Sequence, residues 1–178
     1  MENIVKVLES GSSEEKIKIL ETLDKTDNPE VLEKIISKLD DDDIKVRGEA
    51  FSSLVLNKNK ISDFLIQNLD STSKNIRGFA ALALANRNET NAIPNITKLA
   101  KDERSMVRSC AIGALGHLKA KEAKNVFLDS VLDANVEVRK SAVQAIINLK
   151  FSISEERIKE ISKDADVELL KMLSKLKK

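Results

Sequence analysis

Aromatic side chains and cysteine are scarce in this sequence. It contains no Trp, no Tyr and only five Phe, which disfavours a surface that binds nucleic acid or sugars by stacking on aromatic rings. Its single cysteine, Cys110, can form no disulfide within the chain, and this favours a reducing compartment. The N-terminal residues show no signal-peptide pattern, so we expect a cytoplasmic location.

The sequence also lacks an excess of one charge and any long apolar run. Its 30 Lys and Arg balance 29 Asp and Glu, leaving a net charge of +1, which provides no general field to attract nucleic acid or an anionic membrane. No segment approaches the roughly 20 apolar residues of a membrane-spanning helix. Only two Pro and five Gly are present, and none suggests a flexible linker between domains. We therefore expect neither nucleic acid nor a membrane as a partner.

A segment of about 31 residues recurs along the chain. It is clearest in residues 102–118, DERSMVRSCAIGALGHL, where we expect Asp102 to cap a helix. The arginines of this segment are spaced by 30, 31 and 31 residues: Arg47, Arg77, Arg108 and Arg139. An apolar column with the same period reaches both ends of the chain: Ile4, Ile35, Leu65, Ile96, Phe127 and Ile158. A fixed period of this length indicates a helical repeat architecture.

The period predicts six helical hairpins, each made of an outer helix followed by an inner helix. Their approximate bounds are 1–27, 28–58, 59–89, 90–120, 121–151 and 152–178, in a single domain over residues 1–178. Helix-start signals agree with these bounds. Ser12 and Glu15 form a capping box, and Asn28 precedes a proline suited to the first helical position.

Small residues occupy two positions of each predicted inner helix. The first lies three residues after each arginine and is always alanine: Ala50, Ala80, Ala111 and Ala142. The second lies three residues further on: Ser53, Ala83, Ala114 and Ala145. Small side chains let neighbouring inner helices approach closely, whereas the outer helices meet through larger residues. The stack is therefore expected to curve, with the inner helices on its concave face.

The order Asp, Val-Arg and Ala-x-x-Ala-Leu-Gly in residues 102–116 closely resembles HEAT-like repeats. The most similar subtype is the short one of phycobilisome-lyase-type HEAT proteins, and the strong matches cover the second to fifth hairpins. The resemblance implies an all-α fold, a right-handed α-solenoid of about six stacked helical hairpins. It also implies a structural ladder of Asp and Arg side chains between neighbouring repeats: Asp41, Arg47, Arg77, Asp102, Arg108, Asp133, Arg139 and Asp164. The alternative, a phosphate-binding row of these arginines, is disfavoured by the carboxylate near each of them.

Inner-helix positions two and five residues after each arginine are expected to point into the groove. In the middle of the chain these and nearby positions predict an apolar strip: Phe79, Leu82, Met106, Cys110 and Gly113. An exposed strip of this kind is suited to the apolar face of a partner helix or peptide, with Phe79 and Leu82 as its anchors. The alternative is that these residues are partly covered by their own neighbours.

Side chains suited to catalysis or metal binding are few. His117 is the only histidine, whereas a general base needs partners within reach and a zinc site needs several ligands. Cys110 is expected to be a buried thiol rather than a point of ligand attachment. The acidic run at residues 40–43 lacks the pattern of an EF-hand loop. We therefore predict no catalytic residue, no metal and no cofactor.

These observations predict a non-enzymatic protein–protein interaction module or adaptor, which binds a protein or peptide partner in the concave groove of the inner helices. The resemblance leaves one alternative from another class, a phycobilisome-lyase-like enzyme or enzyme subunit that handles a linear tetrapyrrole. The identity of the partner does not follow from the sequence.

Overall fold

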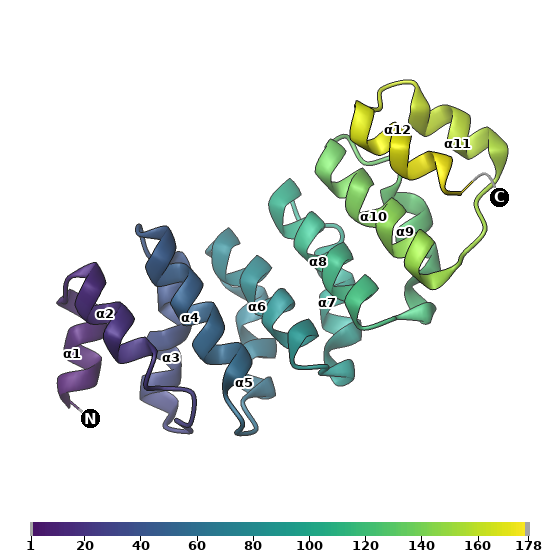
Figure 1. Ribbon diagram of the computed structural model, residues 1–178. Helices are drawn as coiled ribbons and strands as arrows, with labels where there is room; N and C mark the ends of the chain where they lie inside the picture. The colour runs from purple at the N-terminus through teal and green to yellow at the C-terminus, as the bar shows by residue number, and fades with distance from the viewer. Residues whose placement is uncertain (1, 177–178) are drawn as a thin grey trace. The chain divides into compact units, whose positions relative to one another are not determined.

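The computed structural model describes residues 2–176, and all regular elements in that range are helices (Figure 1). The outer helices of the hairpins are α1 (Glu2–Ser10), α3 (Pro29–Ser37), α5 (Ser62–Gln67), α7 (Ile93–Leu99), α9 (Lys124–Ser130) and α11 (Glu155–Ser162). The inner helices are α2 (Ser13–Leu20), α4 (Ile44–Leu56), α6 (Lys74–Asn86), α8 (Ser105–His117), α10 (Val136–Leu149) and α12 (Val167–Ser174). The predicted all-α solenoid of stacked helical hairpins is confirmed.

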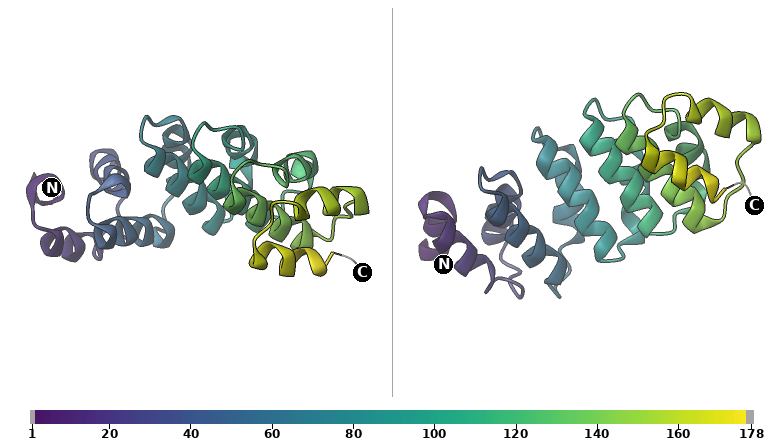
Figure 2. Two further views of the ribbon diagram at one scale, coloured as in Figure 1. Left: turned by 90° about the horizontal axis from the view of Figure 1, so that it is seen from above. Right: turned by 45° about the horizontal axis from the view of Figure 1, so that its top comes forward.

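The chain forms two compact parts, residues 1–89 and residues 90–178, which we call the N-terminal half and the C-terminal half. Each half contains three hairpins, with the outer helices in one layer and the inner helices in another (Figure 2). In the N-terminal half α4 packs against α2 and α6, and in the C-terminal half α10 packs against α8 and α12. The predicted curvature of the whole stack stays a prediction.

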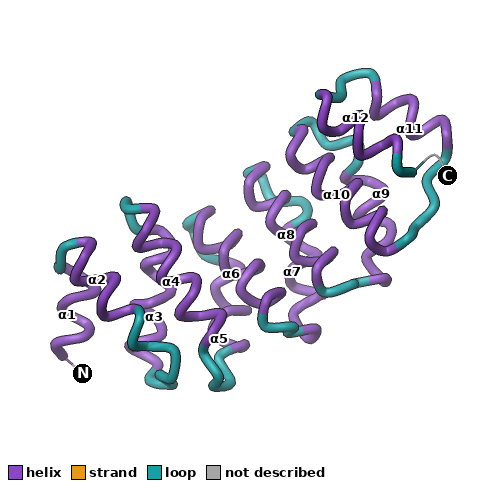
Figure 3. Tube along the Cα trace, in the orientation of Figure 1, coloured by secondary structure: helices purple, strands orange, loops and turns teal. Residues whose placement is uncertain are grey.

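Short 3-10 helices and loops complete the hairpins (Figure 3). η1 (Lys38–Asp40) and η2 (Asn68–Asp70) extend outer helices, whereas η3 (Thr90–Ala92) and η4 (Lys121–Ala123) precede them. None of the helices within residues 2–176 is long and apolar enough to cross a membrane.

Helix starts follow the predicted signals in two places and differ in one. Ser12 and Glu15 form the capping box, and the side chain of Asn28 caps α3. Asp102, however, does not cap α8: the N-cap is Arg104, which makes no capping side-chain bond. The Asp102 carboxylate instead accepts a hydrogen bond of 2.8 Å from the backbone N–H of Arg104, two residues on. It therefore stabilises the loop before the helix, as short acidic side chains commonly do in turns.

The small residues predicted at the inner-helix contacts are buried. Each alanine three residues after an arginine is fully inaccessible to solvent. In the C-terminal half α8 and α10 approach so closely that a Cβ atom added to Gly116 would lie 3.1 Å from the Cβ of Ala145. The apolar column of the outer helices is buried from Ile35 to Ile158, with Phe127 the largest of its side chains, whereas Ile4 is only half-buried. Close packing of the inner helices in this half therefore depends on small side chains at the contact.

Candidate functional site

The two predicted anchors lie on α6 in the N-terminal half. Phe79 and Leu82 are both half-buried. The Phe79 ring packs against Phe51 of α4, with ring centroids 6.1 Å apart and an interplanar angle of 56°, a tilted geometry typical of aromatic pairs. The neighbouring inner helix thus covers part of the side chain that was predicted to face a partner.

The other three predicted binding residues lie on α8 in the C-terminal half. Met106 and Cys110 contact each other, with 3.6 Å between the Cys110 Sγ and the Met106 Sδ. Burial raises the pKa of the Cys110 thiol to about 11, so this thiol is protonated at neutral pH. Gly113 is open, because an added Cβ would meet no atom within 4 Å. A single strip joining these residues to Phe79 and Leu82, across the two halves, stays a prediction.

The predicted carboxylate–arginine ladder is present between α8 and the next repeat. Arg108 donates from Nε and Nη2 to the two carboxylate oxygens of Asp133, at 2.7 and 2.8 Å. Burial alone would raise the pKa of Asp133, but hydrogen bonds from Arg108 and from the backbone of Asn135 outweigh burial and lower that pKa. Both side chains are mostly buried, so this pair stabilises the stack and is not exposed to a ligand.

Each ladder arginine also binds carbonyl oxygens in the loop before its own helix. Arg108 Nη1 donates to the carbonyls of Asp102 and Glu103, at 2.9 and 3.3 Å. Arg47, Arg77 and Arg139 donate in the same way to the loop carbonyls that precede α4, α6 and α10. These bonds favour a structural role over a phosphate-binding row.

The contacts at the two ends of the ladder differ from the Arg108–Asp133 pair. Lys16 occupies the arginine position of the first repeat and forms an ion pair of 2.8 Å with Asp41. Arg139 donates from Nη2 to the backbone carbonyl of Asp164 at 2.8 Å, whereas the family pattern implies the carboxylate. The loop before α12 therefore presents its backbone to Arg139 instead of a charged side chain.

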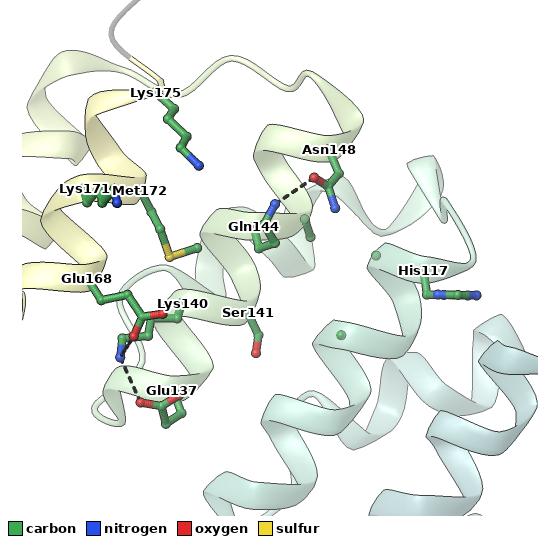
Figure 4. A pocket seen from close by; sticks show the side chains of 13 residues that line it. His117, Glu137, Lys140, Ser141, Gln144, Asn148, Glu168, Lys171, Met172 and Lys175 are labelled. Carbon is green, nitrogen blue, oxygen red and sulfur yellow. Dashed lines mark hydrogen bonds and ion pairs between the residues drawn. The ribbon is translucent and has the colours of Figure 1, made fainter. Parts of the chain in front are cut away.

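A hollow of about 640 Å³ lies across the three inner helices of the C-terminal half (Figure 4). Gly113 of α8 lines it, as do Ser141, Gln144 and Asn148 of α10. Gln144 and Asn148 are joined by a hydrogen bond of 2.7 Å. His117, at the end of α8, is exposed and also lines the hollow. The sequence had singled out Gly113 for binding, and Ser141 and Gln144 occupy the positions two and five residues after Arg139 that were expected to point into the groove.

A cluster of charges borders one end of this hollow. Lys140 forms ion pairs with Glu137 at 3.1 Å, Asp166 at 2.8 Å and Glu168 at 2.6 Å. Hydrogen bonds to these three carboxylates raise the pKa of Lys140. The cluster links α10 to the start of α12, and the sequence pattern did not reveal it because its members belong to different repeats.

Residues 2–176 contain no group of three or more His, Cys, Asp or Glu side chains placed to hold a metal ion. No curated protein matches the chain. Residues 62–147 match the family model described as HEAT repeats. The resemblance to HEAT-like repeats noted in the sequence is thereby confirmed.

Solved structures with the same fold include natural and designed repeat proteins. A chain of the CpcE–CpcF complex of phycocyanin lyase from Nostoc sp. PCC7120 is 19% identical, with 85% of this chain and 100% of that chain covered and a TM-score of 0.70. An engineered protein is 20% identical, with coverage of 98% and 94% and a TM-score of 0.61. A designed armadillo repeat protein in complex with the peptide (KR)4 is 20% identical, with coverage of 98% and 96% and a TM-score of 0.55. At these identities the likeness shows the fold alone.

Proposed function

We propose that this chain of HEAT-like repeats is a non-enzymatic interaction module that binds a protein or peptide partner on its inner helices. The observation that carries the proposal is the hollow across α8, α10 and α12, because stacked hairpins present extended surfaces of this kind to partners. Its volume of about 640 Å³ falls within the range of roughly 300–1,000 Å³ typical of binding sites.

One of the structural neighbours supports a peptide as the occupant. The designed armadillo repeat protein was solved with a bound peptide, so a stack of helical hairpins is a sufficient scaffold for peptide binding. The shape of an extended peptide also suits this hollow, because the hollow is open and does not enclose a compact molecule.

Selection from a random peptide library against the full-length chain tests this function. We expect selected peptides to bind wild type and to bind the Gly113→Leu variant at least about tenfold more weakly, because the new side chain enters the open space at that glycine. Asn125→Leu, on the exposed side of outer helix α9, is the matched control and should retain affinity. Absence of any selected peptide, or equal affinity of the Gly113→Leu variant, would count against the proposal.

The predicted anchors on α6 are tested separately. The double change Phe79→Asp and Leu82→Asp should weaken the binding of any partner that contacts the N-terminal half. Because Phe79 packs on Phe51, far-UV circular dichroism must first show that the variant is folded, and Leu82→Asp alone provides a milder version. Unchanged affinity of a partner for both variants would reject Phe79 and Leu82 as anchors.

The phycocyanin lyase neighbour favours a second candidate, the handling of a linear tetrapyrrole. The comparison covers 100% of the lyase chain, and this coverage supports the second candidate. Cys110 is a poor attachment point at neutral pH, because burial raises the pKa of its thiol to about 11. Titration of the chain into a linear tetrapyrrole should shift the absorbance of the pigment if this candidate is correct, and an unchanged spectrum would exclude binding.

A further inference from the structure

The last hairpin, α11 and α12, joins the stack without the carboxylate–arginine pair that connects α8 to the next repeat. There Arg108 places two nitrogens on the carboxylate of Asp133. At the equivalent junction Arg139 donates to the backbone carbonyl of Asp164, and its Nε is buried with no hydrogen-bond partner among the described residues. A buried donor without a partner costs free energy. This junction therefore lacks an ionic bond of the ladder and contains an unsatisfied polar atom.

The charged contacts between the last hairpin and α10 lie near the surface. Lys140 of α10 contacts Asp166 and Glu168 at 2.8 and 2.6 Å. The Lys140 side chain is mostly buried, but the two carboxylates are 45% and 70% exposed. Ion pairs with such exposed partners contribute little to stability and are weakened by salt. The ionic attachment of this hairpin is therefore weak and sensitive to salt.

The outer helix of the last hairpin adds little to this attachment. α12 packs along α10 (Figure 1), but α11 makes no comparable contact with α9 in the described chain. Between these two outer helices lies a long hydrogen bond of 3.4 Å, from Arg157 Nη2 to the carbonyl of Leu128. A segment with few packing contacts opens at a lower free energy than a segment with many.

The first hairpin, α1 and α2, is attached more firmly. Both of its helices pack on the second hairpin, α1 on α3 and α2 on α4. Lys16 forms an ion pair of 2.8 Å with Asp41, and these side chains are only 15% and 8% exposed. The loop after α2 is held as well, because the buried side chain of Asn57 donates to the carbonyl of Thr26 at 2.8 Å. The first and last hairpins therefore differ in how tightly their neighbours hold them.

Apolar burial is similar in these two hairpins, so it does not offset the difference in polar contacts. The buried apolar residues are Leu8, Leu20 and Leu23 in the first hairpin and Ile158, Ile161, Leu169 and Leu173 in the last. Either set is small, because every residue that a docked hairpin keeps ordered costs conformational entropy. The polar contacts therefore decide which hairpin opens more readily.

We propose that the last hairpin is a detachable wall of the hollow, which undocks reversibly from α10 while α8 and α10 stay folded. The docked hairpin supplies four of the residues that line the hollow: Glu168, Lys171, Met172 and Lys175. Undocking removes this wall and leaves the part formed by α8 and α10. A partner that contacts α10 and α12 together binds the docked state and holds the hairpin in place. This consequence rests on the interaction function proposed above, whereas the opening itself does not.

Hydrogen exchange followed by mass spectrometry tests the proposal on the full chain without a partner. α2 and α12 are matched reporters, since each is the inner helix of an end hairpin and has eight residues. In about 0.05 M NaCl we expect the amides of α12 to exchange at least about tenfold faster than those of α2, after correction for intrinsic rates. The amides of α10 should exchange more slowly than those of α12. Raising NaCl to about 0.5 M should accelerate exchange in α12 severalfold and leave α2 nearly unchanged.

Three lysine variants locate the cause. Lys140→Ala should accelerate exchange in α12 about fivefold at low salt, remove most of its salt dependence and leave α2 unchanged. Lys159→Ala is the matched control, because this exposed lysine of α11 takes no part in the ion pairs of Lys140, and it should exchange as wild type does. Lys16→Ala is the reciprocal variant. Loss of its pair with Asp41 should accelerate exchange in α2 and leave α12 unchanged.

Three results would overturn the inference. Equal exchange in α2 and α12 would show that the last hairpin is held as firmly as the first. Equal exchange in α10 and α12 would show that the hairpin does not open by itself. An exchange rate of α12 that responds neither to salt nor to Lys140→Ala would show that the ion pairs do not hold it. Because no partner enters these measurements, their failure leaves the interaction function standing, and failure of the peptide selection leaves the opening of the hairpin standing.

Discussion

The pairing of Arg108 with Asp133 allows a quantitative prediction about the stack. We expect the double-mutant cycle of Arg108→Ala and Asp133→Ala to give a coupling energy of about 2 kcal/mol. Exposed ion pairs contribute only about 0.2–1 kcal/mol, whereas hydrogen bonds to charged groups in less exposed sites contribute about 1.5–3 kcal/mol. The side chains here are 18% and 13% exposed and form two short bonds, so the upper range applies. The cycle cancels the loss of the Arg108 bonds to loop carbonyls, because both Arg108 variants lack them.

Urea unfolding followed by far-UV circular dichroism is the suitable assay, because the chain has neither Trp nor Tyr for intrinsic fluorescence. The control cycle is Lys140→Ala with Glu168→Ala, where the Glu168 carboxylate is 70% exposed and we expect a coupling below about 1 kcal/mol. A coupling for Arg108 and Asp133 no larger than that of the control would refute the reasoning.

The same pair should also respond to acid. Because the pKa of Asp133 is lowered in the folded chain, its contribution to stability is complete above the unfolded pKa of 3.8. It is lost as the pH falls through the lower, folded pKa. The coupling energy should therefore be constant around neutral pH and should disappear in strong acid, and persistence of the full coupling there would contradict the ionic character of the bond.

Three further predictions concern single residues. Lys119 follows α8 with a φ of 55°, so Lys119→Gly should stabilise the chain by about 1 kcal/mol in urea unfolding. Asn88→Gly (φ 58°) should raise the stability less, because Asn tolerates this conformation. Equal increases in stability would argue against relief of the positive φ as the cause. Gly113→Ala should add about 0.5–1 kcal/mol of stability. Gly116→Ala should stabilise the chain less, because its new Cβ would lie 3.1 Å from the Cβ of Ala145. If the two alanine variants are equally stable, the α8–α10 contact is looser than described. Cys110 should react with iodoacetamide far more slowly in the folded than in the urea-unfolded chain near pH 8, since burial raises its pKa to about 11; equal rates would show that the thiol is accessible.

Much of the fold follows from the sequence because its causes are local. The capping box at Ser12 and the Asn28 cap each depend on residues within one helical turn, and the 31-residue period repeats the same local helix pattern along the chain. The buried alanines could also be predicted, because their spacing places them on one face of each inner helix. Asp102 was misassigned because the sequence does not distinguish a helix cap from a carboxylate that closes the preceding loop.

The candidate site, by contrast, was decided by the tertiary structure. Phe79 is half-covered because Phe51 of a different repeat reaches it, and the three carboxylates around Lys140 come from α10, α12 and the residue before α12. No periodicity reports such contacts, because they depend on distances between side chains of neighbouring repeats. The sequence by itself therefore determined the hairpins and their buried faces through local geometry and hydrophobic burial. Only the packing of those hairpins decided which charged side chains meet across repeats, as Lys140 meets Asp166 and Glu168.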